Sequence, residues 1–85
     1  MKILLFKLST CSPCKAVSKI LTALHIKYTE MIIDENEEAD TLADKYGICS
    51  VPTIIITGND GNEVDRITGV KSKEEFKELL SEYND

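Results

Sequence analysis

The stretch TCSPCK, residues 10–15, decides this sequence because it separates Cys11 from Cys14 by two residues. Such a pair can be a redox couple, half of a metal site or a structural disulfide. It follows a nearly continuous apolar run at residues 3–8, which has no helical spacing and is typical of a buried strand. From Cys14 onward, apolar residues recur at helical spacing. The cysteines are therefore predicted to lie where a strand passes into the first turn of a helix.

Length and composition predict a single domain, residues 1–85. The chain has 85 residues, of which 42% are hydrophobic and 29% charged, an ordinary globular balance. No internal repeat or Pro/Gly/Ser-rich linker divides it. Its formal charge of −5 would repel phosphate backbones, so nucleic acid is not expected as a partner.

The predicted location is the cytoplasm. No apolar run reaches the length of a membrane span, and the apolar N-terminal segment is too short and too interrupted to be an export signal. The chain has three cysteines, so a disulfide framework of the secreted kind would leave one thiol unpaired. This count favours a reducing compartment, in which a CxxC pair is more often reactive than structural.

Alternating strand and helix patterns predict an α/β fold. The predicted order is a strand at 3–8, a helix from 14, a strand at 26–33, a helix from 34, strands at 51–57 and 63–69, and a helix from 72. Asp34 is the expected N-cap of the second helix, whose acidic first turn is solvated, and Gly47 ends it. Ser72 and Glu75 form a capping box. The order βαβαββα, with a right-handed parallel crossover first, gives a four-stranded mixed sheet flanked by three helices.

The chemistry of dithiol exchange suits a cysteine pair at a helix start. The unpaired N–H groups and the positive dipole end of a helix N-terminus stabilise a thiolate. Cys11 is therefore expected to be the more acidic and more exposed thiol, and to attack a target disulfide. Cys14, one turn on and deeper, would resolve the mixed disulfide. Ser12 and Pro13 set the turn between them, since proline suits the first turn of a helix.

Three separated segments resemble the thioredoxin family: CSPCK at residues 11–15, YGICSVPTIII at 46–56 and DRITGVKSKEEFKELL at 65–80. The resemblance implies a thioredoxin-like fold and reduction of disulfides in protein substrates through Cys11 and Cys14. It implies no bound cofactor, because the two sulfurs of a redox-active Cys11–Cys14 disulfide carry the electrons. It also implies a monomer that receives electrons from a donor of the thioredoxin-reductase type.

The same resemblance assigns a substrate-binding surface. It implies a cis peptide bond between Val51 and Pro52, packed against the cysteine pair, which leaves the Val51 backbone free to pair with an extended substrate. It places Gly69 on the same surface, where the absence of a side chain permits close approach.

Several positions depart from the family pattern. Thr10 and Ser12 replace the tryptophan and glycine that flank the first cysteine in thioredoxins. Leu5 stands where thioredoxins carry a buried aspartate, and Glu30 where they carry the accompanying lysine. These changes leave the rate and potential of exchange open, although not its type. Lys7 and Glu30 are candidates to replace the missing acid–base pair.

Two other functions compete with a protein-disulfide reductase. One is a glutaredoxin that is reduced by glutathione, but the sequence has ITGVKS, residues 67–72, where glutaredoxins have a Gly–Gly pair and an aspartate. The other is a non-enzymatic module that binds a thiol or a metal. No metal is expected, because a closed zinc site needs four ligands and the cysteine pair could add only Cys49 and His25, the latter at the far end of the helix. Cys49 is expected near the active site, as a regulatory thiol or, more often, a partly buried apolar residue.

Overall fold

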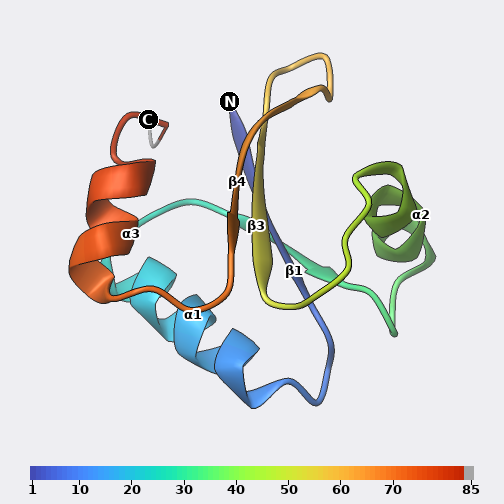
Figure 1. Ribbon diagram of the computed structural model, residues 1–85, viewed down its shortest axis with the longest axis horizontal. Helices are drawn as coiled ribbons and strands as arrows, with labels where there is room; N and C mark the ends of the chain where they lie inside the picture. The colour runs from blue at the N-terminus through green and yellow to red at the C-terminus, as the bar shows by residue number, and fades with distance from the viewer. Residues whose placement is uncertain (84–85) are drawn as a thin grey trace.

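The computed structural model describes residues 1–83, and its elements alternate as the sequence predicts (Figure 1). They are β1 (Lys2–Lys7), α1 (Ser12–Ala23), β2 (Thr29–Ile32), α2 (Glu37–Lys45), β3 (Thr53–Thr57), β4 (Glu63–Thr68) and α3 (Lys73–Leu80). The predicted order βαβαββα is confirmed.

The four strands form one mixed sheet in the order β2-β1-β3-β4. β1 runs parallel to β2 and antiparallel to β3, and β3 and β4 form an antiparallel pair. Phe6 pairs with Thr53, so the end of β1 lies beside the start of β3. This register brings the segment before the cysteines next to the segment that contains Pro52.

Helices cover both faces of the sheet (Figure 1). α1 and α3 lie on one face and α2 lies on the other. β1 and β3 are buried between these layers, which explains why both read as continuous apolar runs rather than alternating ones. Phe76 and Leu80 of α3 are fully buried on the α1 side, and Phe6 and Tyr46 pack edge to face on the α2 side.

Several predicted element limits were wrong. β3 begins at Thr53 instead of Val51, since Val51 and Pro52 lie in the turn before it. Two further limits differ for local reasons. α2 begins at Glu37, and its N-cap is Asn36 instead of Asp34. The Asn36 side chain accepts a hydrogen bond from the Ala39 N–H group.

The second strand is shorter than predicted because His25 ends α1 in the left-handed region, with φ of 58°. The next N–H group, of Ile26, then donates to the Leu21 carbonyl and is used by the helix end instead of the sheet.

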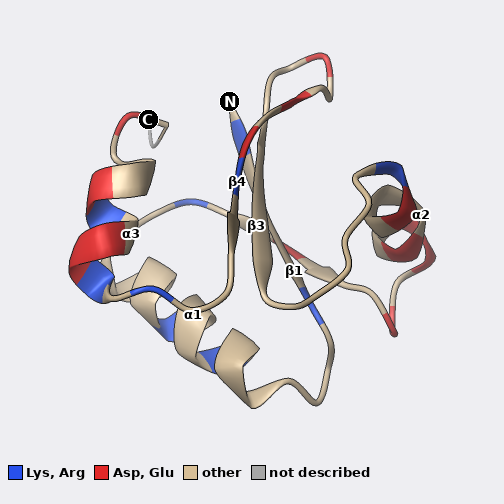
Figure 2. Ribbon diagram, in the orientation of Figure 1, with Lys and Arg blue, Asp and Glu red and all other residues tan. Residues whose placement is uncertain are grey.

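Charge is distributed unevenly over the helices (Figure 2). Acidic residues crowd the first turns of α2 and α3, and α1 has none in its first turn. Lys15 and Lys19 are the charged residues of α1, and both are exposed. Among residues 1–83, no helix has both the length and the apolar character that crossing a membrane requires.

Candidate active site

Cys11 occupies the N-cap position of α1. The chain leaves β1 at Lys7 and turns at once, with the Cys11 N–H group donating to the Leu8 carbonyl at 3.2 Å. Cys11 has extended backbone angles, and its Sγ accepts a hydrogen bond of 3.2 Å from the Cys14 N–H group. A sulfur atom therefore fills the place that a serine or aspartate oxygen usually takes, at the positive end of the helix dipole.

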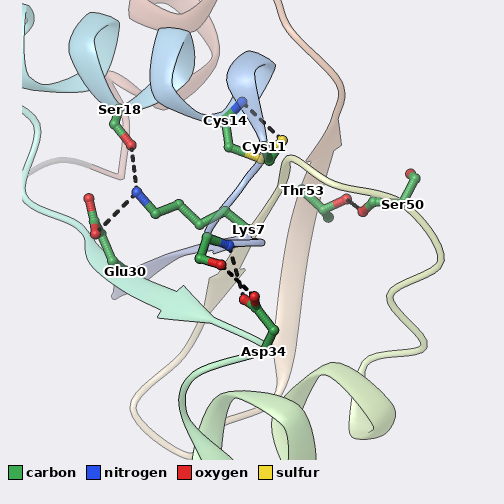
Figure 3. Close-up of a disulfide and its surroundings, with 9 residues drawn as sticks. Lys7, Cys11, Cys14, Ser18, Glu30, Asp34, Ser50 and Thr53 are labelled. Atoms are coloured by element: carbon green, nitrogen blue, oxygen red, sulfur yellow. Dashed lines mark hydrogen bonds and ion pairs between the residues drawn. A yellow bond between two sulfur atoms is a disulfide. The ribbon is translucent and has the colours of Figure 1, made fainter.

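Cys11 and Cys14 form a disulfide, with their Cα atoms 5.2 Å apart (Figure 3). Their burial differs, because Cys11 is half-buried and Cys14 is completely buried. Ser12 and Pro13, which join them in the first turn of α1, are exposed, and so is Thr10. An incoming disulfide can reach Cys11 but cannot reach Cys14 directly.

The peptide bond between Val51 and Pro52 is cis. Pro52 is buried, whereas Val51 is half-buried. The hydroxyl of Thr53 donates to the Ser50 carbonyl at 2.7 Å, which holds the turn before β3. Val51 and Leu8 line one shallow hollow, so the loop before the cysteines and the loop before β3 adjoin.

Gly69 lies beside Pro52, because its N–H group donates to the Pro52 carbonyl at 2.9 Å. Its φ is 87°, in the region that favours glycine. A Cβ atom at this position would meet nothing within 4 Å, so backbone conformation, and not crowding within the chain, is what calls for glycine here. The space beside it is open to a partner.

Asp34 has a role that the sequence did not reveal. Its carboxylate accepts two hydrogen bonds from Ser9, from the N–H group at 2.9 Å and from the hydroxyl at 2.5 Å. These bonds hold the pKa of Asp34 below its usual value. Asp34 therefore fixes the loop that carries Cys11 instead of capping α2. The two residues are 25 positions apart, and nothing in the local sequence links them.

Lys7 and Glu30 form an ion pair on the α1 side of the sheet, with 3.2 Å between the Lys7 Nζ and a Glu30 carboxylate oxygen (Figure 3). The Lys7 Nζ also lies 3.5 Å from the Ser18 hydroxyl of α1. Leu5, two residues before Lys7 on the same strand face, is fully buried. The two residues that the sequence singled out as candidates thus meet each other.

Cys49 is exposed, which corrects the expectation of a partly buried apolar residue. Its thiol donates to the Gly47 carbonyl at 3.4 Å, and the residue lines the same hollow as Val51. Arg66 lies near enough to interact electrostatically with it. The pKa of Arg66 is raised first by its hydrogen bonds to Glu63 and, to a smaller extent, by Cys49.

The described part of the chain, residues 1–83, contains no group of three or more His, Cys, Asp or Glu side chains that could hold a metal ion. His25 stands just beyond the C-terminal end of α1, whereas the cysteines lie at its N-terminal end. Cys11 and Cys14 therefore lie together as a pair of sulfurs at the start of α1. Their arrangement suits two-electron exchange between thiols and a disulfide.

Comparisons with known proteins agree with this chemistry. The family model for glutaredoxins matches residues 3–60. A thioredoxin of Chlamydia caviae is 33% identical over 76 residues, and the match covers 87% of this chain and 74% of that thioredoxin. A prophage-derived thioredoxin-like protein of Bacillus subtilis, YosR, is 32% identical over 82 residues, 96% of this chain and 98% of its own.

A solved structure gives the same result for the fold. A mutant thioredoxin from Halobacterium salinarum superposes with a TM-score of 0.78 at 25% identity, covering 98% of this chain and 74% of the other. Fold and cysteine pair together define the class of thiol–disulfide oxidoreductases. Within that class, the chain belongs to the thioredoxin-like family.

Proposed function

We propose that this protein reduces disulfides in other proteins, with Cys11 as the nucleophile and Cys14 as the resolving cysteine. The observation that carries the proposal is the contrast between the two sulfurs. Cys11 caps α1 and is half-buried, whereas Cys14 is completely buried one turn later. A thiolate at Cys11 would be stabilised by the helix start and reachable by a substrate.

The exchange proceeds in two steps. In the reduced protein, the Cys11 thiolate attacks one sulfur of the target disulfide; the mixed disulfide forms, and the second target sulfur leaves as a thiolate that takes a proton from solvent. Cys14, as a thiolate, then attacks the Cys11 sulfur. The Cys11–Cys14 bond forms, the mixed disulfide breaks, and the target leaves reduced by two electrons. A dithiol donor of the thioredoxin-reductase type would return the electrons.

The proposed substrate surface consists of Val51, Pro52 and Gly69. The bond from the Gly69 N–H group to the Pro52 carbonyl holds the two segments together, and the open space beside Gly69 leaves room for a substrate backbone. An extended substrate segment would pair with the Val51 backbone, in the manner of an added strand. Thr10, Ser12 and Pro13 would tune the rate from the exposed turn around the cysteines. We propose a cytoplasmic monomer.

Reduction of an insulin-type disulfide tests this function. Cys11→Ser should lower the rate by at least about a thousandfold, because Cys14, the other thiol in the first turn of α1, is completely buried and cannot attack a substrate in its place. Cys14→Ser should accumulate a stable mixed disulfide with the substrate, which mass spectrometry detects. Cys49→Ser is the matched control and should keep the normal rate. A Cys11→Ser protein with full activity would contradict the proposal.

A glutathione-dependent activity is the second candidate, because the family model that matches residues 3–60 is the glutaredoxin model. The oxidised protein should be equilibrated in glutathione buffers and, in parallel, in dithiothreitol buffers. A reduction potential of about −270 mV would favour the thioredoxin-like activity. A reduction potential of about −200 to −230 mV would favour the glutaredoxin-like activity.

A further inference from the structure

Lys7 places a charge on the buried face of the sheet. It ends β1, and the residues that precede it on the same face, Ile3 and Leu5, belong to the core beneath α1. Only 14% of the Lys7 side chain is exposed. A charge withdrawn from water is costly unless it has partners, and apolar packing would fill this place at no such cost. The position therefore points to an electrostatic role.

The contacts of Lys7 direct its ammonium group toward the active-site helix (Figure 3). Its Nζ lies 3.5 Å from the Ser18 hydroxyl. Ser18 follows Cys14 by four residues in α1, and residues at this spacing lie one above the other on the same helix face. Ser18 thus lies about one helical turn along α1 from the buried Cys14, and the Lys7 ammonium group contacts this same helix face through the Ser18 hydroxyl.

Glu30 is the counter-charge. One of its carboxylate oxygens lies 3.2 Å from the Lys7 Nζ, and the other accepts a hydrogen bond of 3.4 Å from the Tyr28 hydroxyl. The Glu30 side chain is 40% exposed. It borders a surface hollow that Ser18 and Tyr28 also line, so the ion pair is open to solvent on one side.

The other elements around this site present mostly apolar groups. β3 contributes Ile54 and Ile56 to this core, and the buried residues of α3 are Phe76 and Leu80. On α1, Lys15 and Lys19 are exposed. Among residues 1–83, the ion pair at this site joins Lys7 and Glu30, and Lys19 lines the hollow that Glu30 borders.

We propose that Lys7 is a positioning residue which favours the thiolate of Cys14 in the resolving step, and that Glu30 limits how strongly it does so. This inference rests on the proposed function, in which Cys14 attacks the Cys11 sulfur. Before that attack Cys14 loses its proton to solvent. The Cys11–Cys14 bond then forms, and the target thiolate leaves.

The sign of each effect follows from the charges. Cys14 is completely buried, and burial disfavours a thiolate unless positive charge lies near. Removing the Lys7 ammonium group should hinder the resolving step. Removing the Glu30 charge should assist it, because the ammonium group then acts on Cys14 without a competing anion. Opposite effects from the two halves of one ion pair distinguish electrostatic control from structural damage.

The experiment follows both steps separately in a Cys49→Ser background, which leaves Cys11 and Cys14 as the thiols. The reduced protein is mixed with one equivalent of 5,5′-dithiobis(2-nitrobenzoate). The first coloured thiolate released reports attack by Cys11, and the second reports attack by Cys14. Both rates are measured between about pH 5 and pH 9, which spans the range in which thiols ionise.

Lys7→Met should slow the second release about fivefold at pH 7 and raise the midpoint of its pH profile by roughly 0.5 to 1 unit, as expected for the loss of one positive charge beside the same helix face. Glu30→Gln should lower the midpoint. Lys7→Arg, which keeps the charge, should restore most of the rate. Lys73→Met is the control that should leave the midpoint unchanged, because Lys73 is exposed at the start of α3 and lies beside the C-terminal end of α1.

The inference is overturned if Lys7→Met leaves the second release unshifted, or if both variants move it in the same direction. Should Lys7→Met fail to fold, Glu30→Gln decides alone, and a midpoint that does not fall contradicts the inference. A Cys49→Ser protein that releases a single equivalent would instead contradict the proposed function itself, so the two failures are distinguishable.

Discussion

Helices α1 and α2 differ at both ends. α2 begins with an asparagine N-cap and three acidic residues in its first turn, and it is followed by a glycine, Gly47, with a positive φ of 63°. α1 begins with a cysteine sulfur as N-cap and no acidic residue, and it is followed by His25 at a similar φ. α2 thus follows the rules of local helix stability, and α1 departs from them.

The difference concerns which negative charge complements the positive dipole end of each helix. In α2 the acidic side chains already complement the positive end of the dipole. In α1 no anion competes for it, so the dipole and free N–H groups remain available to a Cys11 thiolate (Figure 2). The lack of an acidic first turn agrees with the proposed thiolate at Cys11, and the packing of Val17 and Leu21 in the core stabilises α1.

The largest expected effect comes from giving α1 an acidic first turn like that of α2. Ser12→Asp places a carboxylate beside Cys11 at the first helical position. The like charge should disfavour the thiolate and slow alkylation of reduced Cys11 by iodoacetamide about tenfold at pH 7, a difference of about 1.4 kcal/mol. Ser12→Asn is the neutral control of similar size. Equal alkylation rates in the two variants would show that the dipole end does not govern this thiol.

Removing the cap of α2 should cost stability but not reactivity. Asn36→Ala loses the acceptor of the Ala39 N–H group, and we expect the free energy of unfolding to fall by about 1 kcal/mol. Urea denaturation measures the change, with the exposed neighbour Glu35→Ala as the control. If both variants lost the same amount, the side chain of Asn36 would not be acting as a cap.

Substituting the residues that follow the two helices should have effects no larger than this, and of opposite sign in each. His25→Gly removes the cost of a positive φ and should stabilise the protein by about 0.5 kcal/mol. Gly47→Ala should destabilise it by about 1 kcal/mol through conformation alone, because the added Cβ would touch nothing within 4 Å. Thermal unfolding of both variants checks the pair. A destabilised His25→Gly protein would mean that the imidazole makes a contact that matters more than its backbone angle.

The smallest effect concerns Asp34, which lies just before α2 and holds the loop before α1. Its pKa is lowered in the folded protein, chiefly by the Ser9 hydroxyl. Its stabilising contribution is therefore complete above the ordinary value of 3.8 and is lost as the pH falls through the lower folded value.

Asp34→Asn should accordingly shrink the difference in stability between pH 7 and strongly acidic solution. Urea midpoints at the two pH values measure this difference, and Asp44→Asn on exposed α2 is the control. An unchanged pH dependence in Asp34→Asn would mean that the bonds to Ser9 do not persist in solution.

The sequence by itself determined the order of elements, the place of the cysteines and the capping box at Ser72, because these depend on periodicity and on contacts three or four residues apart. The resemblance supplied the cis bond before Pro52, which the structure contains.

Only the tertiary structure decided which polar groups meet across the sheet. Asp34 accepts hydrogen bonds from Ser9 instead of capping α2. Lys7 forms an ion pair with Glu30 and contacts Ser18 of the helix that carries the cysteines. These pairs join segments that are far apart in the chain, and their formation depends on strand register and on the direction in which each side chain leaves its element. Local patterns predict where a helix begins, but long-range geometry decides which charge stands beside a reactive sulfur.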